Sequence, residues 1–397
     1  MKKLILLVFI PLVFACGGSD GDSDSPCPNQ PQLTTLEVSN IGYDENTDLA
    51  SATFSGEIQN IQLGANCETF SITNQGFVYG TNIQPTTSDN VVNANGENAS
   101  ANVSDLMPET TYYVRAYLTN TLGTFYGNEV SFTTPESTNP VYLAENGVTI
   151  KAKDWAVVGD SGIVNGITYT IVNREILVNM IANQEDLTRI CTTKVTDMSD
   201  VWLGSYPNFN QDISSWDVSN VYDMTNLFNS ATSFNQPLNS WDVGNVEHMN
   251  YMFFRATSFN QPLNNWDVSN VVDMAAMFSE SSFNSPIGDW DVSNVEIMAA
   301  MFNSSSFNSP IGDWDVSNVE NMSVMFYNTQ FNGDVSNWDV SNVVDMKYMF
   351  AFAVSFNQDL NSWNISNVTD CNNFCIDTPN WSLPKPNFNN CGDTGCD

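Results

Sequence analysis

The chain has 397 residues, which is enough for two or three domains. Its apolar content of 42%, with 12% aromatic residues, can fill substantial cores. The charge is strongly negative, because 45 Asp and Glu residues outnumber 11 Lys and Arg residues and give a formal charge of −34. Such a surface repels nucleic acid and anionic lipid headgroups. The single histidine, His248, excludes most Ser-His-Asp, Cys-His and histidine-rich metal sites.

The first residues predict export and a lipid anchor. Lys2 and Lys3 precede an apolar run, Leu4 to Phe14, that is too short to span a bilayer. The following Val13-Phe14-Ala15-Cys16 resembles the lipobox of bacterial lipoproteins, which implies cleavage before Cys16 and acylation of that residue. We therefore expect a signal peptide over 1–15. The alternative is an ordinary secretory peptide followed by a spare cysteine.

Residues 16–32 predict a lipid-anchored acidic tether. The run Gly-Gly-Ser-Asp-Gly-Asp-Ser-Asp-Ser after Cys16 has no apolar side chain to bury. It also resembles the short acidic export signals of surface lipoproteins in Bacteroidetes-type bacteria. That resemblance implies an outer-membrane, lipid-anchored protein that faces the cell exterior.

An exported protein lies in a compartment that permits disulfides. Four cysteines crowd the C-terminal end and allow two bridges in three connectivities, with a four-thiolate zinc site as the alternative. Cys27 and Cys67 form a further candidate pair, which leaves Cys191 as a buried free thiol. The candidate disulfide cysteines are Cys27, Cys67, Cys371, Cys375, Cys391 and Cys396.

Residues 33–135 predict a β-sandwich, because short runs of β-branched and aromatic residues alternate with Gly, Asn and Pro. The segment from Leu106 to Ala116 reads Leu-x-Pro-x-Thr-x-Tyr-x-Val-x-Ala. It resembles the E–F corner of a fibronectin type III domain, in which a tyrosine hydroxyl bonds back to the loop backbone. Tyr112 occupies that place, and the resemblance implies a spacer or adhesive module.

A short linker, Pro135 to Pro140, leads to residues 141–194, which do not repeat. They end in an amphipathic stretch from Arg174 to Ile190, with apolar residues on one helical face. An array of repeats needs a non-repeating element to cover its first apolar surface. We therefore predict that 141–194 is an N-terminal cap.

Tryptophans from Trp216 to Trp363 recur at intervals of 25, 25, 24, 24, 24 and 25 residues, a period typical of solenoids. In one copy, Leu263, Trp266 and Val268 have the spacing of a leucine-rich-repeat strand. Val271 to Phe278 then has the spacing of one helical face, with Ser269 or Asn270 as its N-cap. The prediction is an α/β leucine-rich-repeat-like solenoid over 195–376, followed by a cysteine-containing C-terminal cap over 377–397.

Two asparagines recur in every repeat, one after a phenylalanine and one before a valine, as in Asn260 and Asn270. They predict either a polar binding track or structural ladders. The ladder is favoured, because stacked amides hydrogen-bond to each other and to turn backbone.

The motif Trp-Asp-Val-Ser-Asn-Val-x-x-Met-x-x-Met-Phe, with Phe-Asn-Gln before it, resembles the BspA-like family of leucine-rich-repeat surface proteins. The stretch from Asp154 to Asp200 also resembles the segment that precedes such repeats. The resemblance spans about 140 to 390 and implies an exported adhesion or host- or matrix-contact role without catalytic residues. The last copy departs from the motif at Asn364, Cys371 and Phe374-Cys375, which favours a cap at that position.

Aspartates follow the tryptophans and predict an acidic stripe on the open face of the sheet. At about 5 Å in water two charges repel by about 0.8 kcal/mol, but at an effective dielectric of 20 the figure is about 3 kcal/mol. The stripe must therefore stay solvated, meet a basic partner or bind calcium; no other cofactor is expected. The candidate residues are Asp217, Asp242, Asp267, Asp291, Asp315 and Asp339, joined by Asp289 and Asp313.

These features predict a protein that is not an enzyme, because identical carboxylates in an open row lack the two different environments of a glycosidase pair. The leading hypothesis is adhesion or binding of a protein partner. The alternatives are a glycan-binding surface protein of a nutrient-capture system and a passive surface spacer. Tryptophans exposed on the sheet face would favour glycan binding, and buried ones would favour adhesion or cation binding.

Overall fold

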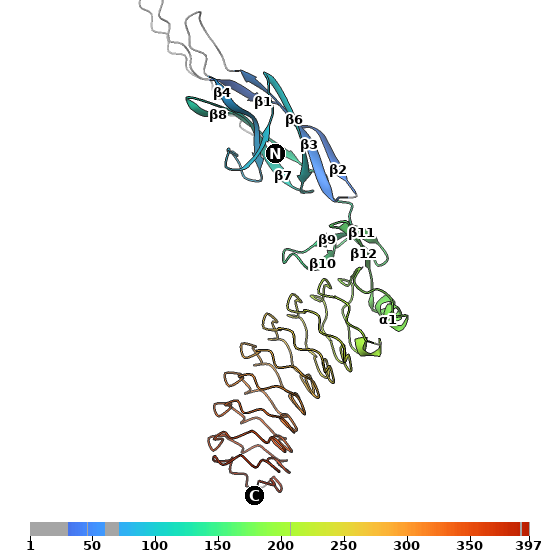
Figure 1. Cartoon of the computed structure of the whole chain (residues 1–397), viewed down its shortest axis with the longest axis vertical. Coiled ribbons are helices and arrows are strands. Elements are labelled where there is room, and N and C mark those ends of the chain that lie inside the picture. Colours follow the sequence, from blue (N-terminus) through green and yellow to red (C-terminus); the bar gives the residue numbers. More distant parts are fainter. Residues whose placement is uncertain (1–30, 46, 60–70, 207, 390, 397) are drawn as a thin grey trace, which may run out of the picture. The chain divides into compact units, whose positions relative to one another are not determined.

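The computed structural model describes residues 31–45, 47–59, 71–206, 208–389 and 391–396. It divides into two compact units: most of the chain up to Pro135 forms the first, and Glu136–Asp397 with Asp44–Leu49 forms the second. Figure 1 shows the elements of both units.

The first unit contains two four-stranded sheets that share one core. One sheet has the order β1-β3-β2, with β6 also paired to β3, and the other has the order β5-β4-β7-β8. Alternate side chains of each strand enter the core, among them Phe54, Phe77 and Val114, because successive residues of a strand point to opposite faces. The strands are β1 Gln32–Thr35, β2 Ser39–Asp44, β3 Leu49–Gln59, β4 Ile72–Gly80, β5 Asn90–Asn93, β6 Asn98–Leu106, β7 Thr111–Asn120 and β8 Gly123–Thr133.

Tyr112 makes the contact that the corner motif predicts. Its hydroxyl accepts a hydrogen bond from the backbone N–H of Met107 at 3.1 Å, and its ring packs against Phe132. This contact fixes the turn between β6 and β7. Membership of the fibronectin type III family stays a prediction.

The second unit begins with two small sheets and a helix. A hairpin pairs β9, Val141–Leu143, with β10, Ile150–Ala152. A three-stranded sheet joins β11, β12 and the short parallel β13. The helix α1 starts after Asn173, whose side chain accepts from the Ile176 N–H, and buries Leu177 and Ile181. The remaining elements are β11 Ser161–Val164, β12 Ile167–Ile171, α1 Arg174–Ala182, β13 Ile190–Cys191 and the 3-10 helix η1 Leu203–Ser205.

The predicted α/β solenoid is wrong. From residue 208 to residue 389, all of which the structure describes, there is neither a helix nor a strand. The repeat region, residues 195–376, is instead a series of stacked tight turns (Figure 1). The regular secondary structure of the described chain is nearly all β, in several separate sheets. Neighbouring repeats meet in single parallel bridges, which link Asp197, Asp223, His248, Asp273, Ile297, Asn321, Asp345 and Asp370 in succession.

The expected helix does not form, because its backbone N–H groups donate either to carbonyls of the next repeat or to carbonyls of their own turn. The amide groups of Met249, Tyr251 and Phe253 donate to carbonyls of the next repeat at 2.8–2.9 Å. The N–H groups between them close turns within the repeat, as Met252 does onto the carbonyl of Met249. Tyr251 lies in the left-handed region at φ 57°, which an α-helix does not admit. The apolar spacing of a helix is thus also met by consecutive turns.

The expected strand around Leu263 and Trp266 is likewise a turn, closed by a bond from the Trp266 N–H to the Leu263 carbonyl at 3.1 Å. The same apolar residues nonetheless form the core. Rings stack from repeat to repeat, with centroids 5.6 Å apart for Phe253 and Phe278 and 6.4 Å apart for Trp266 and Trp290. The core therefore follows the predicted pattern although the backbone does not.

A candidate binding groove on the repeat region

The predicted aspartate row divides in the structure. Asp217 is buried, with 1% of its surface exposed, whereas the equivalent Asp242, Asp267, Asp291, Asp315 and Asp339 are exposed, as are Asp289 and Asp313. The exposed members do not lie on a strand face, because residues 208–389 contain no strand. The row stays a candidate binding face, with Asp217 excluded by its burial.

Each aspartate that directly follows a recurring tryptophan begins a tight turn, because it accepts from the backbone N–H two residues later. Asp291 accepts from both the backbone N–H and the hydroxyl of Ser293, at 3.1 and 2.6 Å, and these bonds lower the pKa of Asp291. The side-chain hydroxyl and backbone N–H of Ser341 lower the pKa of Asp339 in the same way. One carboxylate oxygen of each aspartate is therefore occupied by its own turn.

The recurrent asparagines form two ladders, as the structural interpretation predicts. The asparagine before each valine donates its side-chain N–H to a carbonyl one repeat earlier, as Asn294 does to Ser269 at 2.7 Å. The asparagine after each phenylalanine accepts from the backbone N–H of its successor, as Asn260 does from Asn284 at 2.8 Å. The recurring tryptophans from Trp216 to Trp363 are also buried, and Trp290 donates its indole N–H to the Leu263 carbonyl at 3.0 Å. No tryptophan row is available as a sugar platform.

A groove of about 830 Å³ runs along one asparagine ladder. We call it the acidic groove, and its lining residues are Asn245, Glu247, Asn270, Val272, Asn294, Glu296, Asn318, Glu320 and Asn342. The glutamates are not among the binding residues that the sequence predicts. Their signal is the dipeptide Val-Glu at one position of three repeats, Glu247, Glu296 and Glu320.

The acidic groove presents hydrogen-bond acceptors. The Asn270, Asn294 and Asn318 side chains each donate one N–H to a carbonyl of the preceding repeat, at 2.6–2.7 Å. Their side-chain oxygens stay available beside the carboxylates, which carry no donor when ionised. The groove thus fits a ligand that supplies donors and positive charge.

The cations of the array do not neutralise this groove. Residues 195–397 contain 24 Asp and Glu residues and three basic residues, Arg255, Lys347 and Lys385. Arg255 pairs with Glu280 at 2.8 Å, Lys347 pairs with Asp345 at 3.1 Å and Lys385 lies over the Trp381 ring. None of the three lines the acidic groove.

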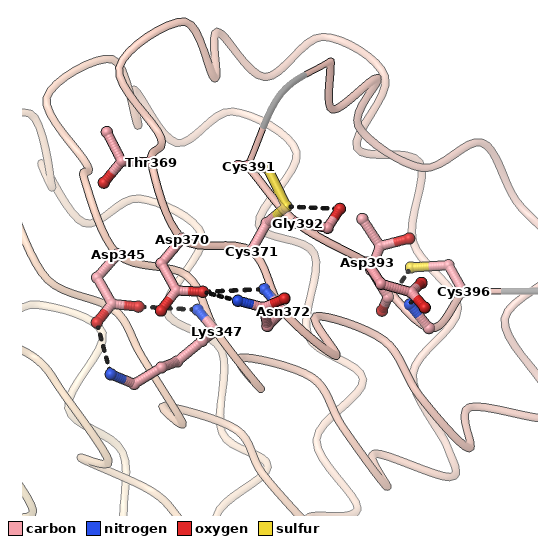
Figure 2. Close-up of a disulfide and its surroundings, with 12 residues drawn as sticks. Asp345, Lys347, Thr369, Asp370, Cys371, Asn372, Cys391, Gly392, Asp393 and Cys396 are labelled. Atoms are coloured by element: carbon pink, nitrogen blue, oxygen red, sulfur yellow. Dashed lines mark hydrogen bonds and ion pairs between the residues drawn. A yellow bond between two sulfur atoms is a disulfide. The ribbon is translucent and has the colours of Figure 1, made fainter.

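The C-terminal cysteines close the array. The structure joins Cys371 to Cys391 and Cys375 to Cys396, so the free thiol in the described part of the chain is the buried Cys191. Figure 2 shows the Cys371–Cys391 bridge beside the last repeats. The Cys371 N–H donates to the Cys391 carbonyl at 3.0 Å, so the tail occupies the place of a further repeat. Cys16, Cys27 and Cys67 lie outside the described residues.

Two further features bear on earlier predictions. Across the described ranges, no three His, Cys, Asp or Glu side chains gather in a metal-binding arrangement, and calcium binding by the aspartates stays a prediction. Within the same residues, no helix is long and apolar enough to cross a membrane.

The fold and groove define a protein built from stacked turn repeats of 24–25 residues. The model of one family, described as Mycoplasma protein of unknown function, DUF285, matches residues 174–285 and again 279–383. Together these matches cover more than half of the chain, so the protein belongs to this family. Comparison with curated proteins gave no match.

Proposed function

We propose that the protein is a non-catalytic binding protein whose acidic groove takes a basic, extended segment of a protein partner. The observation that carries the proposal is the composition of the groove lining: Glu247, Glu296 and Glu320 supply negative charge, the ladder amides add side-chain oxygens as acceptors, and no basic residue is among the lining residues. Lys and Arg side chains are the protein groups that offer donors and positive charge together.

Electrostatics favours such a partner. Glu296 and Glu320 lie on successive repeats, which stack at about the 4.8 Å spacing of paired strands. Both side chains are exposed, and two carboxylates at that separation repel by about 0.9 kcal/mol in water. A cation between them relieves that repulsion, and the net charge of −34 steers basic partners toward the surface.

The proposed setting is the cell exterior. The signal peptide over 1–15, lipidation of Cys16 and the acidic tether would hold the protein on the outer membrane, and adhesion to a protein surface would be the outcome. Incorporation of labelled palmitate into the wild type and not into C16S would test the anchor. Equal labelling of both would contradict it.

The groove is tested with fluorescent lysine-rich and arginine-rich peptides and the double variant E296Q/E320Q. We expect about a tenfold higher Kd, a change of about 1.4 kcal/mol, and a weaker salt dependence. The matched control is D289N/D313N, which removes two charges from the same two repeats outside the groove lining. If the control weakens binding as much, net charge and not the groove binds the peptide. If neither peptide binds the wild type, the proposed function is wrong.

A further inference from the structure

A second hollow, of about 390 Å³, lies within the second unit between the β9–β10 hairpin and the first repeats. We call it the hairpin pocket. Unlike the acidic groove it combines an aromatic ring, a cation and carboxylates. The residues that matter here are Tyr142, Glu145, Asn146, Lys151, Asp217 and Asp242.

The walls of the hairpin pocket are held in place. The Ile150 N–H donates to the Ser215 carbonyl at 2.9 Å and joins the hairpin to the array. Asn146 fixes the hairpin loop, because its side-chain oxygen accepts from the Val148 and Thr149 N–H groups at 3.1 and 3.0 Å. The pocket is therefore preformed, as small-molecule sites usually are.

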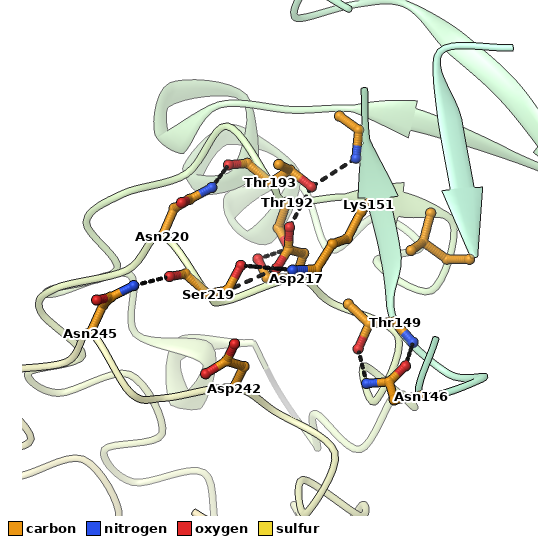
Figure 3. Close-up of polar contacts among 12 residues, drawn as sticks. Asn146, Thr149, Lys151, Thr192, Thr193, Asp217, Ser219, Asn220, Asp242 and Asn245 are labelled. Carbon is orange, nitrogen blue, oxygen red and sulfur yellow. Dashed lines mark hydrogen bonds and ion pairs between the residues drawn. The ribbon is translucent and has the colours of Figure 1, made fainter. Parts of the chain in front are cut away.

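Lys151 and Asp217 line one wall of the hairpin pocket, and Figure 3 shows the Lys151 side chain reaching toward Asp217 and Ser219. The Asp217 carboxylate accepts from Thr193 and Ser219 hydroxyls at 2.6 and 2.7 Å, and Lys151 lies 3.6 Å away. The Lys151 ammonium also donates to the Ser219 hydroxyl at 3.1 Å and stays 29% exposed. It keeps donor capacity toward the pocket, whereas Asp217 is fully occupied.

Asp242 differs from its equivalents, because the repeat pattern breaks beside it. Asp217, Asp267 and Asp291 each accept from the hydroxyl of a serine two residues later. At Asp242 that position is Gly244, which offers only its backbone N–H, at 3.3 Å. Asp242 is exposed and lines the hairpin pocket, whereas Asp217, the other aspartate of this series in the lining, is buried. The hydroxyl donor is therefore missing at the aspartate that a ligand in the pocket can reach.

The backbone does not require this glycine. A Cβ at position 244 would meet the nearest atom, an Asp242 carboxylate oxygen, at 3.4 Å, an ordinary van der Waals contact. Nothing in the local geometry therefore explains the loss of serine. Because glycine has no side chain, there is room beside Asp242, and its carboxylate lacks the hydroxyl donor that its equivalents have.

We propose that the hairpin pocket binds a neutral saccharide. A sugar hydroxyl both donates and accepts, so one can replace the missing serine hydroxyl at Asp242 and another can accept from Lys151. Tyr142 lies directly opposite Lys151 in the hairpin register and is 39% exposed, which offers an aromatic face to the apolar face of a sugar ring.

The charges argue against anionic ligands, because Glu145 and Asp242 repel a phosphate, a sulfate or an acidic sugar. A neutral ligand rich in hydroxyl groups can donate to these carboxylates and accept from Lys151. The proposal is independent of the acidic groove, so either can fail while the other stands.

The test is a glycan array that spans neutral, N-acetylated and acidic glycans, followed by calorimetric titration of the full chain with the glycans that bind. We expect neutral or N-acetylated glycans to bind and both G244S and Y142A to raise their Kd at least about tenfold. G244S restores the serine of the neighbouring repeats and should melt no lower than the wild type. The matched controls are S269G, which copies the glycine into the next repeat, and Y251A, which removes an exposed tyrosine outside the pocket.

Binding that both controls leave unchanged and both pocket variants weaken supports the proposal. It is overturned if no glycan binds the wild type, if acidic glycans alone bind, or if G244S and Y142A bind as tightly as the wild type.

Discussion

The first unit and the repeat region satisfy their backbone hydrogen bonds by different means. In the first unit, long strands such as β7 and β8 pair along their length, so the backbone is satisfied by the backbone. In the repeat region, backbone bonds between repeats are interrupted by turns, and Asn, Asp and Trp side chains supply the missing partners. Polar side chains should therefore carry more stability in the repeats than on the strands.

The positions of the tryptophans allow the stability of the second unit to be measured separately from that of the first. All ten lie between Trp155 and Trp381, in the second unit, so tryptophan fluorescence follows the unfolding of that unit alone.

The largest expected effect on stability comes from a substitution that interrupts the stack of phenylalanine rings. Phe278 is fully buried and stacks on Phe253, Phe283 and Phe302. F278A should lower the free energy of unfolding by about 3–5 kcal/mol, measured by urea titration with tryptophan fluorescence. F54A, which empties the core of the first unit, should leave this transition unchanged. Equal shifts would mean that the two units unfold as one.

Removal of a C-terminal disulfide should come next. Cys371 and Cys391 enclose a loop with a sequence separation of 20 and tie down the tail that accepts the last inter-repeat bonds. C371S/C391S should cost about 3 kcal/mol in the same fluorescence titration. The control is C191A, which alters a cysteine outside any bridge. A loss below about 1 kcal/mol would show that the tail holds without the bond.

A ladder asparagine provides the direct test of the comparison. N294A removes the bond to the Ser269 carbonyl and should cost about 1 kcal/mol, measured by calorimetry. On β6, Asn102 accepts from the Thr53 hydroxyl at 2.8 Å, but the strands around it stay paired. N102A should therefore cost less than about 0.5 kcal/mol. Equal losses would remove the distinction between the two regions.

The smallest expected effects are on the pH dependence of stability, where Asp273 and Asp291 should act in opposite directions. Burial raises the pKa of Asp273, so its charge destabilises the fold, and stability is lost as pH rises through the raised pKa. D273N should stabilise at pH 7 and make no difference at low pH. Asn321 already occupies the equivalent bridge position and accepts from the Ser323 N–H at 2.9 Å.

D291N should behave in the opposite way. Bonds from Ser293 lower the pKa of Asp291, so its contribution to stability is present above the unfolded pKa of about 3.9 and is lost as pH falls through the lowered value. The variant should destabilise at pH 7 and match the wild type in acid. Urea midpoints between pH 3 and pH 8 would check both, and the same sign for both variants would contradict the assignment.

Several features could be predicted from the sequence because they depend on side-chain chemistry that repeats. The burial of Trp266 and Phe278, the amide ladders and the corner contact of Tyr112 all follow from apolar spacing or from amide and hydroxyl chemistry. The groove glutamates could be found from the Val-Glu repeat. The hairpin pocket could not, because no local pattern places Tyr142 beside Asp242, a hundred residues away.

By itself the sequence determined the period of the repeats and the identity of their core, because both are written in residue type and interval. The tertiary structure decided the backbone. An N–H can bond within its own turn or to the next repeat, and that choice depends on a neighbour 24 or 25 residues away. The same reason explains Asp217, which is buried while its equivalents are exposed because only its repeat receives Lys151 and Thr193.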